Sequence, residues 1–376
     1  MSKRLLYMVE PRQATWLELF FDLIFVVALG KVTHLLAHTH HGHLEPNVWP
    51  VFFLTFIPLW WLWVGHTVYS NRFDSDARPH RFITLFIMFL MLLMSVKIDG
   101  HIHRHYGLFV GVYGIARLII AGLYFRSAKN YPDKAEFASK VGLCYMIGAL
   151  VSMSALLVKW PMAFVLFYAG ICIDMIAPKI LKGRLPKLPV HRDHLIERMG
   201  LLAIILLGES IISMSSSLGD VAWNSLTVIT ATCGFAMLCM IWWIYFDSFP
   251  LLIESKRDVN GNAILYSQLL TYMSFAILAN TIRHAILNDL SIDEFRIMTV
   301  IGMVMFYLGK QTAYFVNIPE YRKYIIINTV GMLIVVGISL FFNNLQYIMM
   351  GTAFSMVVYI LLNWRAQMIL YGNVKL

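Results

Sequence analysis

TWLELFFDLIFVVALG, residues 15–30, is a run apolar enough to lie in lipid, yet it contains two carboxyl groups. Glu18 and Asp22 are four residues apart, a spacing that places both on one face of a helix. A carboxyl group near the centre of a bilayer costs roughly 2.5–3.5 kcal/mol on insertion scales, so such residues usually face protein or water. The stretch therefore predicts a first membrane-spanning helix with a functional polar face.

The composition of the chain extends this prediction to the whole protein. Of its 376 residues, 59% are hydrophobic and only 14% are charged, whereas about 25% are charged in a soluble domain. Apolar runs of about 20 residues indicate membrane spans. Twelve such runs are centred on residues 17–36, 48–69, 82–96, 107–124, 141–158, 161–176, 196–218, 225–246, 264–283, 297–316, 325–342 and 347–370. We predict an all-α integral membrane protein with about twelve transmembrane helices, although several runs are short and eleven or ten spans remain possible.

The positive charge of the chain fits the same arrangement. A formal net charge of +9 would suggest nucleic acid as the partner of a soluble protein, but in a membrane protein the position of each basic residue matters more than the sum. With twelve spans, nearly all lysine and arginine residues fall in connections on one side, and the opposite connections hold mainly Arg104 and Lys159. We therefore expect both termini on the cytoplasmic side, and the lipid bilayer rather than nucleic acid as the partner.

Weak internal similarities predict two halves of six spans each, residues 1–188 and 189–376. The run WWLW at 60–63 recurs as WWIYF at 242–246, and the first and seventh spans align with Gly30 opposite Gly208. Six spans per half would give both halves the same orientation, as two parallel pseudo-repeats around an axis along the membrane normal. The alternative is that tryptophan pairs are simply common at membrane interfaces.

Two long motifs carry a family resemblance. They are LELFFDLIFVVALG at residues 17–30 and HLIERMGLLAIILLGESII at residues 194–212. The chain resembles the low temperature requirement A family of bacterial membrane proteins, whose pattern is LELFFDLxFV in the first span and ERxGLxxIxxLGES later. The resemblance implies a multi-pass protein of the cell (inner) membrane. The family name records a cold-growth phenotype and implies no biochemical activity.

A second resemblance concerns the first span alone. Residues 17–25, LELFFDLIF, are similar to the first-span signature of the endolysosomal and bacterial potassium-channel family, in which a Phe-Ser-Asp triplet opens a pore-lining helix. Here Phe21 stands in place of the serine, and the later half has no such triplet.

Four carboxyl groups are the predicted transport or proton-coupling residues: Glu18, Asp22, Glu197 and Glu209. A carboxyl that binds and releases a proton near neutral pH is what a proton-coupled carrier needs. Structural alternatives stay open for two of them. Glu18 could cap its helix, or pair with Arg12 or Arg198 and lock two helices. The positive end of the helix dipole suffices to explain Glu197.

Four further charges are predicted to support these carboxyl groups: Lys31, Arg117, Asp174 and Arg198. The alignment of spans one and seven predicts a Lys31–Glu209 pair, and Arg117 would satisfy Asp174, although a buried pair can also serve only to fix packing. A charge at membrane depth costs about 3 kcal/mol when it faces lipid. We therefore expect the six deep charges to face one shared polar interior: Glu18, Asp22, Lys31, Arg117, Asp174 and Glu209.

Three functions compete on this basis. The first is a secondary transporter driven by protons or another cation, with the first and seventh spans lining a cavity for an unknown small molecule or ion. The second is a cation channel of the potassium type lined by the same spans, with Phe20 and Phe25 as a constriction and Gly30 and Gly208 as points of close approach. The third is a non-transporting sensory or lipid-binding protein whose buried charges only hold helices together.

Other chemistry finds little support. Four histidines of the first outer loop could converge on a divalent transition metal, but without Cys, Asp or Glu ligands at fixed spacing a solvated polar loop is the better explanation: His38, His40, His41 and His43. The sequence contains no Walker, GxSxG or HExxH motif and no dinucleotide fingerprint. We expect neither an enzyme nor a cofactor, and the sequence leaves a homo-oligomer open.

Overall fold

The computed structural model describes residues 13–73, 77–96, 98, 102–180, 190–247 and 261–371. Within these ranges the chain forms twelve α-helices, three short 3-10 helices and one two-stranded β hairpin. The α-helices are α1 (Trp16–His34), α2 (Val48–Phe73), α3 (Arg78–Val96), α4 (Ile102–Asn130), α5 (Ala135–Ser154), α6 (Met162–Ile180), α7 (Arg192–Gly219), α8 (Ser225–Phe246), α10 (Gly261–Leu287), α11 (Ile292–Asn317), α12 (Arg322–Ser339) and α13 (Leu345–Tyr371). The remaining elements are β1 (Thr39–His40), β2 (His43–Leu44), η1 (Pro132–Lys134), η2 (Ala155–Leu157) and η4 (Pro319–Tyr321).

Each of the twelve predicted apolar runs coincides with one of these α-helices. Eight helical segments of the described chain are long and apolar enough to cross a membrane, those of α2, α3, α4, α5, α7, α8, α12 and α13. In α6, a shorter stretch, Met162–Ile176, is apolar. The all-α class and the multi-pass membrane character are therefore confirmed.

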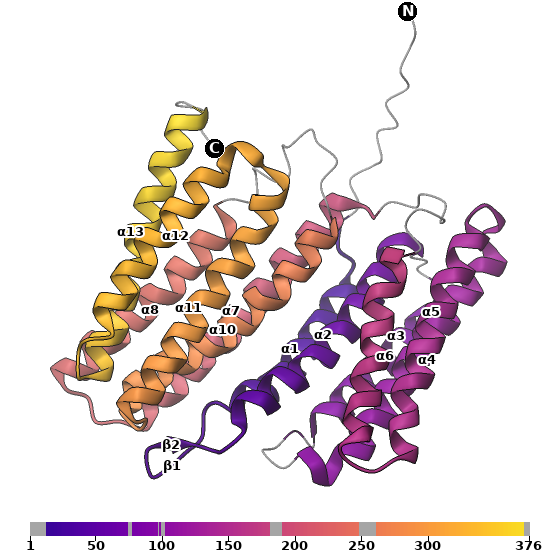
Figure 1. The fold of residues 1–376 in the computed structure, drawn as a ribbon, viewed down its shortest axis with the longest axis horizontal. Coiled ribbons are helices and arrows are strands. Elements are labelled where there is room, and N and C mark those ends of the chain that lie inside the picture. Colours follow the sequence, from indigo (N-terminus) through magenta and orange to yellow (C-terminus); the bar gives the residue numbers. More distant parts are fainter. Residues whose placement is uncertain are drawn as a thin grey trace, which may run out of the picture.

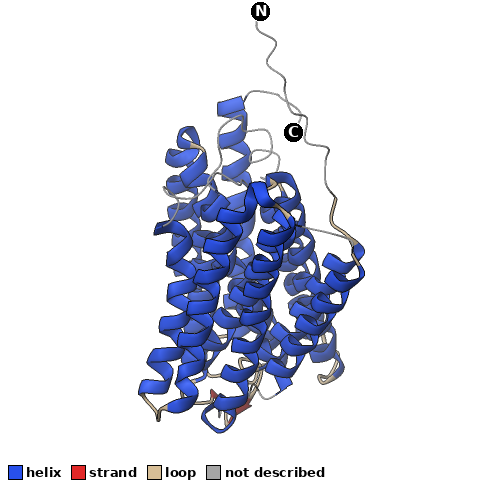
Figure 2. Cartoon of the chain, turned by 90° about the vertical axis from the view of Figure 1, so that its right-hand side faces the viewer, coloured by secondary structure: helices blue, strands red, loops and turns tan. Residues whose placement is uncertain are grey.

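The helices lie in two groups side by side, α1 to α6 in one and α7 to α13 in the other (Figure 1). All run roughly along one direction, with the hairpin at one end (Figure 2). The groups meet where α1 packs on α7, and α1 and α2 both contact α10. This junction holds the polar residues of the first and seventh predicted spans.

Helix α1 begins with a capping box. The Glu18 backbone N–H donates to Thr15 Oγ1 at 3.3 Å, and the Thr15 backbone N–H donates to Glu18 Oε2 at 3.0 Å. This reciprocal arrangement satisfies two N–H groups that a helix start leaves without intrahelical partners. It also fixes the position of the Glu18 carboxyl, which is 3% exposed.

The hairpin after α1 connects the two groups at the opposite end. His41 and Gly42 form its two-residue turn, both with positive φ, which suits a tight antiparallel connection. The Gly42 carbonyl accepts from the Ser291 backbone N–H at 2.7 Å, and Glu294 Oε2 accepts from the Leu44 backbone N–H at 2.8 Å. A loop of the first group is thus attached to the start of α11 in the second.

Candidate functional site

A buried ionic cluster lies where α1 packs on α7. Arg198 Nη2 of α7 donates to Asp22 Oδ1 of α1, Arg198 Nε lies 3.4 Å from Asp22 Oδ2, and Arg198 Nη1 lies 3.6 Å from Glu18 Oε1. Arg198 and Asp22 are fully buried. The two carboxyl groups predicted to share a helix face do so, and one guanidinium serves both. The structural alternative, in which Glu18 caps its helix and pairs with Arg198, predicts the same contacts. The alternative partner Arg12 lies outside the described residues.

Helix α2 supplies an aromatic wall to this cluster. Trp63 Nε1 donates to Asp22 Oδ1 at 2.7 Å, and the Arg198 guanidinium lies 5.5 Å from the centre of the Trp63 ring. Trp60 stacks on Trp63 at 4.9 Å, and the Phe25 ring contacts both. Asp22 therefore accepts hydrogen bonds from two different helices in a site closed by large aromatic rings.

A hydrogen-bonded line connects the cluster to the end of the helices. The His191 backbone N–H donates to Asn71 Oδ1 at 2.7 Å, which orients the amide so that Asn71 Nδ2 donates to His194 Nδ1 at 2.9 Å. His194 Nδ1 is therefore an acceptor, and the ring proton lies on Nε2, which donates to Glu18 Oε2 at 3.2 Å. Since His191 is exposed, the line runs from the protein surface to the buried carboxyl groups.

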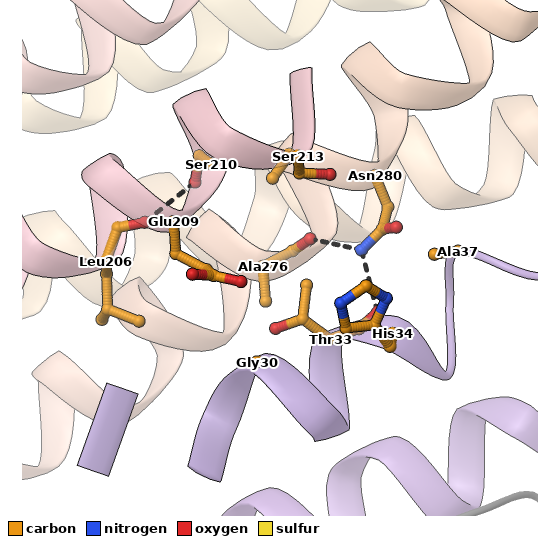
Figure 3. Close-up of a pocket in the computed structure, with 11 residues that line it drawn as sticks. Gly30, Thr33, His34, Ala37, Leu206, Glu209, Ser210, Ser213, Ala276 and Asn280 are labelled. Carbon is orange, nitrogen blue, oxygen red and sulfur yellow. Dashed lines mark hydrogen bonds between the residues drawn. The ribbon is translucent and has the colours of Figure 1, made fainter. Parts of the chain in front are cut away.

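A second polar site lies between α1, α7 and α10, toward the hairpin end (Figure 3). It is a cavity of about 20 Å³, which is room for roughly one water molecule. Its lining is mainly small and polar: Gly30, Thr33, His34, Ala37, Leu206, Glu209, Ser210, Ser213, Ala276, Ala279 and Asn280. Gly30 lets α1 approach α7 closely, because a Cβ at this position would lie 3.2 Å from Glu209 Oε1.

The predicted pairing of Lys31 with Glu209 is not present. Within the described chain Glu209 forms no ion pair or hydrogen bond, and Lys31 is exposed. The alignment placed Lys31 at the right depth, but Gly30 is the residue that faces Glu209, and the next residue on a helix points about 100° away.

Apolar side chains separate the two polar sites. Arg198 and Glu209 are roughly 16 Å apart along the axis of α7 at 1.5 Å per residue. Every buried residue of α1 and α7 between the sites is apolar: Phe25, Val26, Ala28 and Leu29 on α1, and Met199, Gly200, Leu202, Ala203, Leu206 and Leu207 on α7. The interface thus holds two polar sites with a barrier between them.

The predicted pairing of Arg117 with Asp174 is confirmed, but it lies apart from both sites. Arg117 Nε of α4 donates to Asp174 Oδ2 of α6 at 2.8 Å, and both side chains are buried. The guanidinium also lies 4.1 Å from the centre of the Tyr145 ring. Asp174 and Arg117 pack directly against Gly148 and Gly65, where a Cβ would collide with them.

The expectation of one shared polar interior was therefore wrong. Helix α2 stands between the two ion pairs: its Trp63 side chain contacts Asp22, whereas the Trp61 carbonyl accepts from Arg117 at 3.4 Å. Each ion pair is buried among its own helices, and the neighbouring residues there supply its hydrogen bonds.

The remaining predicted residues take no part in these sites. Glu197 is exposed at the start of α7, Phe20 is 46% exposed on the outside of α1, and a Cβ at Gly208 would meet nothing within 4 Å. Among the described residues no group of three or more His, Cys, Asp or Glu side chains could hold a metal ion. In the connection between α1 and α2, His43 contacts Glu294 at 3.0 Å and His40 contacts Glu45 at 3.4 Å.

Sequence reasoning missed several residues. His194 and Asn71 extend the ionic cluster to the surface, and Trp63 donates directly to Asp22. Lys310 of α11 is 5% exposed and donates to the Tyr359 hydroxyl at 3.2 Å. The lysine was detectable, because it lies inside a predicted span where any charge deserves a functional interpretation. The other three depend on which helices become neighbours.

Comparison with known proteins finds a family model and a relative that match most of the chain. A family model described as bacterial low temperature requirement A protein matches residues 13–366. An uncharacterized protein of Rhizobium meliloti (strain 1021) is 25% identical over 293 residues, which cover 75% of this chain and 70% of that protein.

Proposed function

The chain belongs to the bacterial low temperature requirement A family, and we propose that it is a secondary transporter, coupled to protons or another cation, whose path follows the α1–α7 interface. One observation carries the proposal. Two polar sites, each with a buried or half-buried carboxyl of the membrane domain, lie at opposite ends of this interface and are separated by apolar side chains. A carrier needs such an arrangement, in which each site communicates with one side and the barrier prevents free leakage.

The proposed duplication into residues 1–188 and 189–376 is supported by contacts that recur in both halves. Helix α1 packs on α2 and α3, and α7 packs on α8 and α10; α5 packs on α6, and α12 packs on α13. Each half also buries one cation on its fourth helix against its sixth. Arg117 faces Asp174 between α4 and α6, and Lys310 faces Tyr359 between α11 and α13. In this proposal α1 and α7 are equivalent helices beside the pseudo-twofold axis.

The distribution of basic residues supports an orientation with both termini in the cytoplasm, in the inner membrane of the cell. The line from His191 through His194 to Glu18 would then begin on the cytoplasmic side. The cavity of Glu209 would lie nearer the outer side, close to the hairpin.

A structural role is the second candidate, and specific contacts favour it. The capping box of Glu18 and its pairing with Arg198 are what a helix lock requires. In that case the charges would stabilise the α1–α7 contact without moving a proton or an ion. A channel would use the same path along the α1–α7 interface. It would differ from a carrier in its rate of ion flux, because ions pass through a channel down their gradient without a coupled step that saturates.

The test is flux into proteoliposomes that contain the purified protein, with proton, sodium and potassium gradients applied separately. We expect a gradient-driven flux that Asp22→Asn and Glu209→Gln each reduce at least tenfold. Glu197→Gln is the matched control, because it removes an exposed carboxyl from the same helix as Glu209; its flux should equal that of the unaltered protein. Unchanged flux in both test variants, or no flux under any gradient, would contradict the proposal, and a fast potassium current without saturation would identify a channel.

A further inference from the structure

The Asn71 side chain is held in one orientation by the backbone of His191. Asn71 Oδ1 accepts from the His191 backbone N–H at 2.7 Å, and Asn71 Nδ2 donates to the His191 carbonyl at 3.0 Å. Exchanging the two ends of the amide would set donor against donor and acceptor against acceptor, so this orientation is unambiguous. Asn71 Nδ2 therefore faces His194 Nδ1 as a donor, at 2.9 Å.

This contact determines which nitrogen of His194 carries the ring proton. In a histidine, the hydrogen bond made by one ring nitrogen decides the protonation of the other. His194 Nδ1 accepts from Asn71, so the proton lies on Nε2, which donates to Glu18 Oε2 at 3.2 Å. Asn71 is 0% exposed and His194 is 1% exposed, so both bonds are shielded from bulk water. His194 is thus held as one neutral tautomer.

The carboxyl group that receives this bond is arranged as an ionised group. Glu18 Oε2 also accepts from the Thr15 backbone N–H at 3.0 Å and from Thr15 Oγ1 at 3.1 Å. Three donors of the described chain therefore meet at one oxygen, which suits a carboxylate and leaves no place there for a proton. For Oε2 to bind a proton, one of these donors must release its own or withdraw.

The hydrogen-bonded line from His191 reaches the surface but cannot conduct a proton in this state. An imidazole passes a proton on only if one nitrogen takes up a proton while the other releases one. The group that faces His194 Nδ1 is an amide, which does not release a proton near neutral pH, and both its ends are bonded to the backbone amides of His191. No acid in the line can therefore protonate Nδ1.

The charged and titratable groups around His194 belong to the ionic cluster or lie on the exposed face of α7. Glu18 approaches it from α1, and Arg198 follows it by one turn on α7. His66 of α2 interacts electrostatically with both of these residues and with His80 of α3. Residues 261–272 of α10 include no charged side chain. The other charged groups nearby are Asp193 and Glu197, both exposed on α7, and Asp247 after α8, which accepts from Asn363 and Gln367.

We propose that Asn71 is a positioning residue that closes the route through His194 to protons. By donating to Nδ1 it prevents the imidazole from taking up a proton, so Glu18 is not loaded through His194 until Asn71 withdraws. Asn71 lies on α2 of the first group of helices and His191 directly precedes α7 of the second, so a relative movement of the two groups would break this contact. The meaning of the proposal for coupling rests on the transport function proposed above, whereas the tautomer can be measured without transport.

The test is ¹⁵N NMR of the histidine ring nitrogens in the purified protein at neutral pH. The signals of His194 are identified by their absence in His194→Gln, and protonated and unprotonated ring nitrogens have well-separated shifts. We expect an unprotonated Nδ1 and a protonated Nε2 in the unaltered protein. In Asn71→Asp both nitrogens should be protonated, because a carboxylate of nearly the same shape then faces Nδ1 and can only accept.

Asn224→Asp is the matched control. It adds a carboxylate at the exposed N-cap of α8, where aspartate accepts the same bond from the Thr227 backbone N–H. The His194 signals should not change in this variant. A protonated Nδ1 in the unaltered protein would overturn the proposal, whether or not any variant folds. Unchanged ring protonation in Asn71→Asp would overturn it too.

Flux into proteoliposomes tests the consequence for proton access. Asn71→Asp should move the pH profile of flux by at least about one pH unit, and the double variant with His194→Gln should have the same profile as His194→Gln alone. Identical profiles in the unaltered protein and in Asn71→Asp would overturn the role in proton access. Absence of flux in every protein would contradict the transport function, and the NMR measurement would then decide the role of Asn71 by itself.

Discussion

Replacing Asp174 by asparagine should destabilise the protein by about 3–5 kcal/mol, the usual cost of removing one partner from a buried ion pair. Arg117 and Asp174 are 0% and 1% exposed, and both Nε and Nη2 of Arg117 donate to Asp174 Oδ2. The asparagine carbonyl oxygen could still accept a hydrogen bond, and among the described residues the guanidinium would also keep the Trp61 carbonyl at 3.4 Å and the ring of Tyr145. A neutral amide cannot balance its charge.

Removing both charges together should cost much less. Apolar residues of similar volume in place of a buried ion pair are often neutral or even stabilising by about 1–4 kcal/mol. If the double variant Arg117→Met with Asp174→Leu is close to neutral and Asp174→Asn costs about 3–5 kcal/mol, the double variant should be more stable than Asp174→Asn by at least about 2 kcal/mol. With the matching single variants Arg117→Met and Asp174→Leu, the double variant completes a cycle that measures how far the pair acts as a unit.

The assay is reversible unfolding in mixed detergent micelles, followed by tryptophan fluorescence. Glu136→Gln is the matched control, because it removes a carboxylate from an exposed pair on α5, where Lys140 Nζ lies 2.5 Å from Glu136 Oε1. Exposed pairs of this spacing contribute about 0.3–0.5 kcal/mol. The reasoning is refuted if Asp174→Asn costs no more than this control, or if the double variant is as unstable as the sum of its single variants.

Three further predictions concern α1 and its neighbours. Gly30→Ala should reduce flux into proteoliposomes, because the added methyl would lie 3.2 Å from Glu209 Oε1. Gly208→Ala is its control and should leave flux unchanged, because its methyl would meet nothing within 4 Å. Equal flux in the two variants would contradict this prediction. Thr15→Ala should lower the free energy of unfolding by about 1 kcal/mol through loss of the capping box, and Thr15→Ser should restore it. Trp63→Phe keeps an aromatic ring but removes the hydrogen bond from Trp63 Nε1 to the buried Asp22 carboxylate. It should lower the free energy of unfolding by about 1.5–3 kcal/mol in the same assay. A loss below about 0.5 kcal/mol, which is what a surface substitution costs, would contradict a hydrogen bond to a charged acceptor.

The sequence predicted the helices well because their signal is local. Twelve apolar runs became twelve helices, and the i, i+4 spacing alone placed Glu18 and Asp22 on one buried face. The pairing of Arg117 with Asp174 was also within reach, because few deep charges were available and each needed a partner of opposite sign.

The contacts between helices were harder to predict because they depend on rotation about each helix axis. An alignment gives the depth of Lys31 but not the direction of its side chain, and Gly30 faces Glu209 instead. Likewise, nothing local indicates that Asn71 of α2 reaches His194 of α7. Such contacts follow from which helices pack together, and a single sequence does not encode that information in any short pattern.

The hairpin end and the Arg198 end join the two groups of helices by different kinds of contact. At the hairpin end, His284 and Arg283 of α10 donate to the carbonyls of Leu36 and Ala37, and the Ser291 backbone N–H donates to the Gly42 carbonyl. Each such bond contributes about 0.5–1.5 kcal/mol, and water can take the place of either partner. At the other end, separation would pull a buried guanidinium away from two carboxyl groups, and a buried charge left without a partner costs about 3–5 kcal/mol. The Glu209 cavity, which Ala37 borders, therefore lies at the end where several small, replaceable contacts hold the interface rather than one ionic cluster.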